Sequence, residues 1–325
     1  MKKLYVLAFL IAVGLATPGH GRDLRVVDVY PEGSPTRGAL AYMSTIIERQ
    51  TNGRLRIVPS QDRSFDSENF TVAQVRTGKL DMARVSLPVL NATAPATAVL
   101  SAPFVFGSGI ALRRILDGPI GAEILAELEQ HDLIGLCFFD VGARSIYTVA
   151  KPVRSAADIK GLRLRSQPGD IGGALWQSFG ANMVAMPYSR VADGLRTHLI
   201  DGATGNWMSF VSGEHYRHAK YFTLTEHARP PGVVIFSLQV WRELDQQDRK
   251  IILGAAKDAA IREQELMDAY AKQARRTVEA AGVKIIEDFD KKSFSDPKEA
   301  VYDSLFTLPK QQDLFLRLRA AGEGT

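Results

Sequence analysis

The sequence predicts an α/β protein with two domains and one long helix that spans both. Short apolar strand segments alternate with helical patterns in two separate cycles, which is typical of α/β domains with mainly parallel sheets. The run from Asp245 to Ala281 contains no proline and repeats apolar residues at helical intervals. At 1.5 Å per residue it predicts a helix of about 55 Å, longer than one ordinary domain is wide. This helix is continuous, or it is broken at its one interior glycine, Gly254, or by a bend elsewhere.

The first cycle follows the N-terminal segment. Its strands are short, apolar and bounded by polar turns, and its helices carry apolar residues on one face. The expected elements are a strand at 24–29, a helix at 35–48, a strand at 55–58, a helix at 68–77 and a strand at 80–86. The apolar run 133–139 holds the sole cysteine, Cys137, which has no partner for a disulfide within the chain and is expected to be a small core residue.

The second cycle begins near Ile146. Its expected elements are a strand at 162–165, a helix at 171–179, a strand at 183–186, a helix at 189–197 and a strand at 200–203, with a later strand at 233–238. The two cycles contain similar phrases 120 residues apart, at 76–83 and 196–203. Each phrase ends a helix and opens a strand, which suits two domains of similar construction. The alternative is chance similarity, since a helix end followed by a strand is common.

The similar phrases place polar residues at the carboxyl ends of two strands, Arg84 and Ser86 in one and Thr204 and Asn206 in the other. Open α/β sheets bind ligands beyond the carboxyl ends of their strands, so two domains that face each other would form one cleft. We expect residues 22–143 with about 230–260 to form the first domain. We expect 144–229 with about 261–325 to form the second.

Residues 1–21 have the pattern of a secretory signal peptide. Lys2 and Lys3 precede a 13-residue apolar run, and small residues follow it as far as Gly21. The apolar run is too short to span a bilayer. We therefore expect export of the chain and cleavage after Gly21.

The composition excludes several classes of function. The formal net charge of +4 falls to +2 without the two N-terminal lysines, which gives no basis for nucleic-acid binding. No P-loop or Gly-x-Gly-x-x-Gly motif is present, so we expect no nucleotide cofactor. His215 and His218 are spaced for one helical face, yet no third ligand accompanies them, so we expect no metal site. The sequence contains no Gly-x-Ser-x-Gly motif, which is typical of one class of hydrolases, so nothing supports a hydrolase.

Arg165 is the leading candidate for ligand binding. In the strand around it, Leu162 and Leu164 share one face while Arg163 and Arg165 share the other. If Arg165 faces a cleft, its planar fork of donors suits a carboxylate, and a small acid is the expected partner. The alternative is an arginine on a solvated face.

Several phrases distributed over residues 24–294 together resemble one family. They are Thr51-Asn52-Gly53-Arg54-Leu55, Ala83-Arg84-Val85-Ser86, Pro103-Phe104-Val105-Phe106, Asp117-Gly118-Pro119-Ile120-Gly121, Gly142-Ala143-Arg144-Ser145-Ile146-Tyr147, His215-Tyr216 and 219–227. The chain resembles the solute-binding proteins of tripartite ATP-independent periplasmic (TRAP) transporters, of the DctP type. It is most similar to the branch that takes up sugar acids such as glucuronate and galacturonate. The resemblance implies a periplasmic-binding-protein fold of type II kind, with a ligand cleft between the domains.

The resemblance also implies roles for individual residues. Arg165 stands where the family clamps the ligand carboxylate, and Arg144 looks like the second cation that holds the acid. Glu68 matches an acid that accepts hydrogen bonds from sugar hydroxyls, with a first-turn helix acid as the alternative. Asn206 matches a second asparagine of the sugar-acid branch, so its side-chain amide is expected to contact the ligand. Trp207 either stacks on a sugar ring or belongs to the core.

The chain departs from the family pattern at several positions. Tyr30 precedes Pro31 where the sugar-acid branch has a histidine, and Thr204-Gly205 replace an acid and an asparagine. Gly169 stands where a polar residue is common, and 61–66 replace a glycine-rich turn. Tyr30 and Arg84 are included among the candidate ligand-binding residues. The sequence thus predicts the class of ligand and leaves its identity open.

These inferences predict a periplasmic receptor without catalytic activity or cofactor, which binds a small organic acid, expected to be a hexuronate, and delivers it to a TRAP permease in the membrane. Two alternatives remain at this point. One is an exported enzyme that acts on an acidic sugar. The other is a sensory receptor for an organic acid, since a signalling partner needs the same domain closure.

Overall fold

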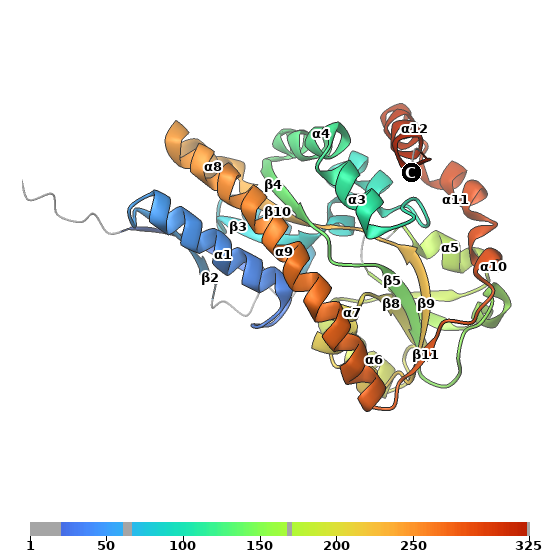
Figure 1. Cartoon of the computed structure of the whole chain (residues 1–325). Helices are drawn as coiled ribbons and strands as arrows, with labels where there is room; N and C mark the ends of the chain where they lie inside the picture. Colours follow the sequence, from blue (N-terminus) through green and yellow to red (C-terminus); the bar gives the residue numbers. More distant parts are fainter. Residues whose placement is uncertain (1–20, 61–66, 168–170, 324–325) are drawn as a thin grey trace, which may run out of the picture.

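The computed structural model describes residues 21–60, 67–167 and 171–323. Two α/β units are joined by strands that pass between them and by one long helix (Figure 1). Residues 1–20 of the predicted signal segment 1–21, residues 61–66 and Gly169 lie outside the described residues. Among the helices of the described ranges, none is long and apolar enough to cross a membrane.

The first sheet has five strands in the order β2-β1-β3-β10-β4. Their bounds are β1 (Arg22–Asp28), β2 (Leu55–Pro59), β3 (Met82–Ser86), β4 (Leu133–Phe139) and β10 (Gly232–Ser237). β1 pairs in parallel with β2 and β3, while β10 is antiparallel to β3 and β4. Its helices are α1 (Pro35–Gln50), α2 (Glu68–Arg76), α3 (Gly109–Leu116), α4 (Pro119–Glu127) and α8 (Leu238–Glu243).

The second sheet has six strands in the order β11-β9-β5-β8-β6-β7. Their bounds are β5 (Arg144–Thr148), β6 (Arg163–Ser166), β7 (Asn182–Ala185), β8 (Gly202–Gly205), β9 (Tyr221–Ala228) and β11 (Lys284–Ile286). β6 is parallel to β7 and β8, and β5 is antiparallel to β8 and β9. Its helices are α5 (Gly173–Ser178), α6 (Val191–Arg196) and α7 (Trp207–Ser212).

Both sheets are mainly parallel, as expected, and among the described strands each sheet contains one that runs antiparallel to the rest, β10 in the first sheet and β5 in the second. The reason is the connection between the units: β4 runs on into β5 of the other sheet, and β9 returns into β10. Strands that arrive from the other unit pair antiparallel with their neighbours. The strands and helices expected from the two sequence cycles are confirmed, each within two residues at either end.

Helix α9 (Gln246–Ala280) is continuous over 35 residues. The Asp245 side chain accepts a hydrogen bond from the Asp248 N–H at 2.7 Å and so caps its first turn. Gly254 faces open space and causes no break. Ile252 packs into the core of the first unit and Val278 into a core of the second. The helix therefore spans both units, as predicted (Figure 1).

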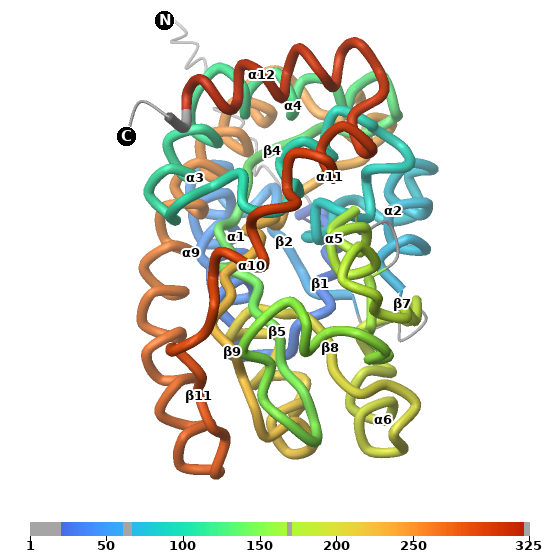
Figure 2. Tube along the Cα trace, turned by 90° about the vertical axis from the view of Figure 1, so that its right-hand side faces the viewer, coloured from blue at the N-terminus to red at the C-terminus, as the bar shows by residue number. Residues whose placement is uncertain are grey.

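The C-terminal helices pack on the first unit, although residues from about 261 to 325 were expected in the second domain. α10 (Lys291–Ser295) still contributes Phe294 to the second unit. α11 (Lys298–Leu305) and α12 (Pro309–Glu323) then return to the first unit, where Tyr302 and Phe315 join its core. Figure 2 shows this path from β11 to α12. Burial of these aromatic rings, which the expected boundary did not consider, decides the position of the segment.

Candidate functional site

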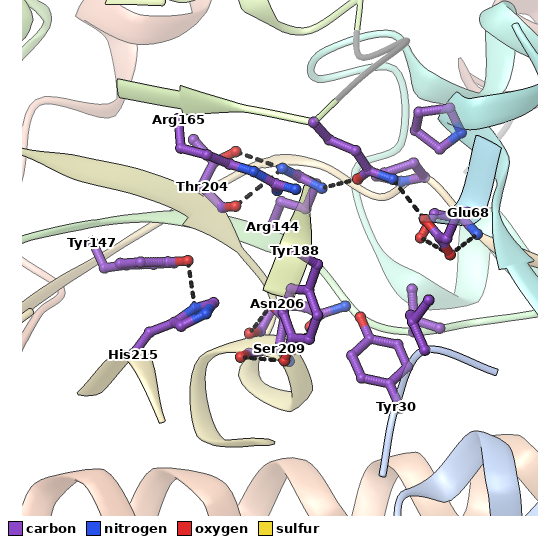
Figure 3. A pocket seen from close by; sticks show the side chains of 16 residues that line it. Tyr30, Glu68, Arg144, Tyr147, Arg165, Tyr188, Thr204, Asn206, Ser209 and His215 are labelled. Carbon is purple, nitrogen blue, oxygen red and sulfur yellow. Dashed lines mark hydrogen bonds between the residues drawn. The ribbon is translucent and has the colours of Figure 1, made fainter. Parts of the chain in front are cut away.

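A pocket lies between the two sheets, next to the carboxyl ends of β1, β3, β6 and β8 (Figure 3). It contains about 560 Å³ of atom-free space, part of which is open to solvent. Both units contribute to its wall. The lining residues are Val29, Tyr30, Glu68, Ser86, Pro88, Val141, Arg144, Tyr147, Arg165, Gln167, Tyr188, Thr204, Asn206, Ser209, His215 and Pro230.

Arg165 lies on β6 and lines the pocket with 6 % of its surface exposed. Its Nε donates a hydrogen bond to the Met186 carbonyl at 3.1 Å, which fixes the plane of the guanidinium. Arg163, two residues earlier, is paired with Asp201 at 2.7 Å and keeps 43 % of its side chain exposed. The period-two pattern alone could not separate the two arginines, because both leave the strand on the same face.

Arg144 begins β5 and is held by the residue that replaces the family's acid. Its Nη2 donates to the Thr204 carbonyl at 3.0 Å and to the Thr204 hydroxyl at 2.7 Å. Its Nη1 donates to Gln167 Oε1 at 3.3 Å. The departure at Thr204 thus keeps a polar group that positions the second pocket arginine.

Glu68 comes from the first turn of α2 in the first unit and reaches the same pocket. Its Oε1 accepts hydrogen bonds from the Ser86 N–H at 2.8 Å and the Ser86 hydroxyl at 3.1 Å. Its Oε2 accepts one from Gln167 Nε2 at 3.1 Å. Burial raises the pKa of Glu68, while Arg84 and the two Ser86 donors act in the opposite direction.

Asn206 is the N-cap of α7, and this role determines what it can offer a ligand. Its Oδ1 accepts the Ser209 N–H at 2.8 Å. Because the oxygen is committed to the helix, the amide NH₂ group is the part available to the pocket, and it can only donate. The geometry therefore favours Asn206 as a donor to an anionic or hydroxyl oxygen.

Tyr30 lines the pocket and Arg84 supports it from behind. Arg84 is 1 % exposed and is not among the lining residues. Its guanidinium lies 5.0 Å from the centroid of the Tyr30 ring, and its Nη1 lies 3.8 Å from Glu68 Oε1. A Cβ atom at Gly232 would lie 2.6 Å from Arg84 Nη2, so a larger residue there would displace the Arg84 guanidinium. Arg84 is therefore placed to position Tyr30 and Glu68 rather than to contact a ligand.

Trp207 lies outside the pocket lining. Its ring stacks on Phe222, with the centroids 4.4 Å apart and an angle of 13° between the planes. It packs against a core cluster of the second unit. This position agrees with the core alternative for Trp207 and not with stacking on a sugar.

Several pocket residues were not proposed from the sequence, among them Tyr147, Tyr188, Gln167 and Ser209. Tyr147 lies in a phrase that the family shares, which was the one available signal. His215, which the sequence analysis named in a family phrase and as a possible metal ligand, forms a hydrogen bond through Nδ1 with the Tyr147 hydroxyl at 2.8 Å. No group of three or more potential metal ligands occurs among the described residues.

The stability of the protein should decrease at acid pH because of His215. Burial, with a contribution from Arg165, lowers the pKa of His215 to about 3. Between pH 6.5 and 3 the unfolded chain binds a proton that the folded chain excludes. The free energy of unfolding should therefore fall as pH falls through this range, by up to about 1.4 kcal/mol per pH unit.

Urea unfolding at pH 7.5, 5.5 and 4.5 checks this prediction. His215→Gln should show a smaller loss between pH 7.5 and 4.5 than the wild type, while the matched variant His131→Gln should behave as the wild type does. His227 is also buried with a lowered pKa and will leave part of the effect. An identical loss in His215→Gln and the wild type would contradict a neutral, buried His215.

Comparison with known proteins gives consistent results over almost the whole chain. The family model described as "Bacterial extracellular solute-binding protein, family 7" (DctP) matches residues 26–308. A solute-binding protein of Chromohalobacter salexigens is 32% identical over 303 residues, which cover 93% of this chain and 90% of that protein.

Solved structures agree with the sequence comparison. A TRAP periplasmic solute-binding protein of Bradyrhizobium sp. BTAi1, in complex with galacturonate, is 39% identical, with a TM-score of 0.89 and coverage of 92% of this chain and 100% of that one. The corresponding protein of Pseudomonas putida F1, with bound D-glucuronate, is 32% identical, with a TM-score of 0.87 and coverage of 92% and 97%. Both are similar to this chain throughout the two units.

Proposed function

The chain belongs to the bacterial extracellular solute-binding proteins of family 7, the DctP-type binding proteins of TRAP transporters, and from this membership we propose that its cleft binds a hexuronate such as galacturonate or glucuronate. A binding protein of this family captures a small carboxylate and passes it to membrane permease subunits. From the same family membership we propose that TRAP permease subunits in the membrane receive the acid from this chain.

One observation carries the proposal: two arginines and one acid from different units line a single pocket. Arg165 and Arg144 supply the donors that a carboxylate requires, since guanidinium forks match its two oxygens. Glu68 supplies an acceptor for the hydroxyl groups of the same molecule. A sugar acid carries both kinds of group.

Closure of the two units around the ligand follows from the position of these side chains. Arg165 belongs to the second sheet and Glu68 to the first unit. A ligand that contacts both units binds the closed form more tightly than the open form and so shifts the equilibrium toward it. The closed complex is the form that we propose the permease recognises. The predicted signal segment would direct the protein to the periplasm for this purpose.

Galacturonate should raise the melting temperature of the protein, and galactose should not. At about 100 times its Kd, a ligand that binds only the folded state stabilises it by about 2.7 kcal/mol. Galactose has the hydroxyl groups but lacks the carboxylate, so it cannot use the two arginines. Thermal-shift measurements with both sugars and with glucuronate test the proposal. Equal shifts with galactose and galacturonate would contradict a site built around the acid group.

We also propose that the protein releases its ligand chemically unaltered, as expected of a transport protein. After incubation with the protein, galacturonate should be recovered with its mass and isomeric form intact. Mass spectrometry and NMR spectroscopy measure both. A product that accumulates in proportion to protein concentration would support the enzyme alternative instead.

A further inference from the structure

Gln167 connects the charged groups of the two units and has no role in the sequence analysis. It follows β6, lines the pocket and is 8 % exposed. Its Oε1 accepts a hydrogen bond from Arg144 at 3.3 Å, and its Nε2 donates one to Glu68 at 3.1 Å. Both bonds are drawn in Figure 3. The side chain thus links a cation of the second unit to an acid of the first.

The partners of Gln167 fix the orientation of its amide. A guanidinium can only donate, so the Gln167 oxygen must face Arg144. An ionised carboxylate can only accept, so the NH₂ group must face Glu68. The hydrogen bonds to both Glu68 oxygens, from Ser86 and from Gln167, are those that an ionised carboxylate accepts. Rotation of the amide by 180° would lose both bonds.

The hydrogen-bonding capacity that remains defines a small recognition site. Glu68 Oε1 already accepts two hydrogen bonds from Ser86, whereas Oε2 accepts one from Gln167. A carboxylate oxygen accepts about two, so Oε2 keeps one acceptor position, and the Gln167 NH₂ group keeps its second N–H. An acceptor beside a donor matches two neighbouring hydroxyl groups, one that donates and one that accepts.

We propose that Gln167 is a specificity-determining residue: together with Glu68 it binds two neighbouring hydroxyl groups at the uncharged end of the ligand. This inference rests on the proposed function and narrows the ligand class to sugar mono-acids. Figure 3 shows Arg165 on one side of the pocket and Glu68 on the other, with Arg144 between them. The carboxylate of the ligand belongs with the arginines and its hydroxyl groups with Gln167 and Glu68.

The same arrangement disfavours a ligand with a second carboxylate. A diacid would place one anion against the arginines and the other against Glu68, in a part of the pocket where Gln167 offers a single free N–H. Like charges brought together in a site of this kind are strongly unfavourable. We therefore expect galactarate, which has a carboxylate at both ends, to bind at least about 100-fold more weakly than galacturonate.

Isothermal titration calorimetry of Gln167→Met tests the inference. Methionine has a similar length but neither donates nor accepts in the way an amide does. The variant should bind galacturonate about tenfold to hundredfold more weakly, the cost of hydrogen bonds to charged groups. Gln177→Met, at an exposed position on α5, is the matched control and should bind as the wild type does. Wild-type affinity in Gln167→Met would overturn the inference, and so would equal binding of galactarate and galacturonate by the wild type.

A second variant tests the inference even if the Gln167→Met protein is too unstable for binding measurements. Glu68→Gln removes the negative charge at the hydroxyl end, so the affinity for galactarate relative to galacturonate should rise at least about tenfold. An unchanged ratio would overturn the inference. These outcomes are distinct from failure of the proposed function, in which the wild type would bind no hexuronate at all.

Discussion

Replacing Arg165 with alanine is expected to weaken the binding of galacturonate at least about tenfold. The guanidinium is almost completely buried in the pocket, and its Nε is already oriented by the Met186 carbonyl. Without it the ligand carboxylate would be desolvated with one charged partner fewer. Loss of one partner of a buried charge pair costs about 2–5 kcal/mol. Isothermal titration calorimetry measures the change directly.

Arg163→Ala is the matched control for this prediction. Arg163 lies on the same strand but is paired with Asp201 at the surface. Its replacement should leave the Kd for galacturonate unchanged, because the side chain does not line the pocket. A melting curve for each variant separates loss of binding from loss of folding. If Arg165→Ala, still folded, bound galacturonate as tightly as the wild type, Arg165 could not be the clamp for the carboxylate.

Asn206→Asp is expected to weaken binding about 100-fold or more while the fold is retained. Aspartate caps a helix as well as asparagine does, so the bond to the Ser209 N–H can persist. The group that faces the pocket, however, changes from a donor to an anion. That anion would repel the ligand carboxylate and compete with it for Arg165 and Arg144. Calorimetry gives the affinity, and thermal unfolding gives the stability.

Asn206→Ser separates the loss of the donor from the added charge. Serine also caps helices, so the stability of α7 should be kept. It has no NH₂ group, and the expected loss of affinity for galacturonate is smaller, about tenfold, the cost of one hydrogen bond to a charged group. The prediction fails if Asn206→Asp and Asn206→Ser weaken binding equally, because charge would then have no part in the effect.

The strands and helices near the site could be predicted because their patterns are local. The strand that carries Arg165 and the long helix α9 follow from periodicity and from the absence of proline. The one antiparallel strand in each sheet, β10 or β5, could not be predicted in this way. It depends on β4 and β9 crossing to the other unit, a non-local pairing with no periodic signal in the sequence.

Two candidate ligand-binding residues, Trp207 and Arg84, illustrate a second limit of the sequence analysis. Trp207 and Arg84 both stand next to strand ends, as ligand-binding residues often do, yet one stacks on Phe222 and the other lies behind Tyr30. Conversely, Gln167, Tyr188 and Ser209 line the pocket although no motif marks them. Whether a side chain at a strand end faces ligand or core depends on the neighbouring elements, which lie far away in the chain.

The C-terminal helices were misplaced for the same reason. Their apolar faces predict packing against something, but the partner is a core more than 100 residues earlier in the chain, where Tyr302 donates a hydrogen bond to the Pro103 carbonyl. Two units offered apolar surface, and the sequence contained no signal to choose between them.

By itself, the sequence determined the α/β class, the long helix and an arginine suited to a carboxylate, since each depends on the spacing of neighbouring residues or on the chemistry of one side chain. Only the tertiary structure decided that Arg84 lies behind Tyr30, that Thr204 holds Arg144 and that Gln167 bridges to Glu68. These contacts join residues from different elements and different units. Their energies depend on distances that exist only after the chain has folded.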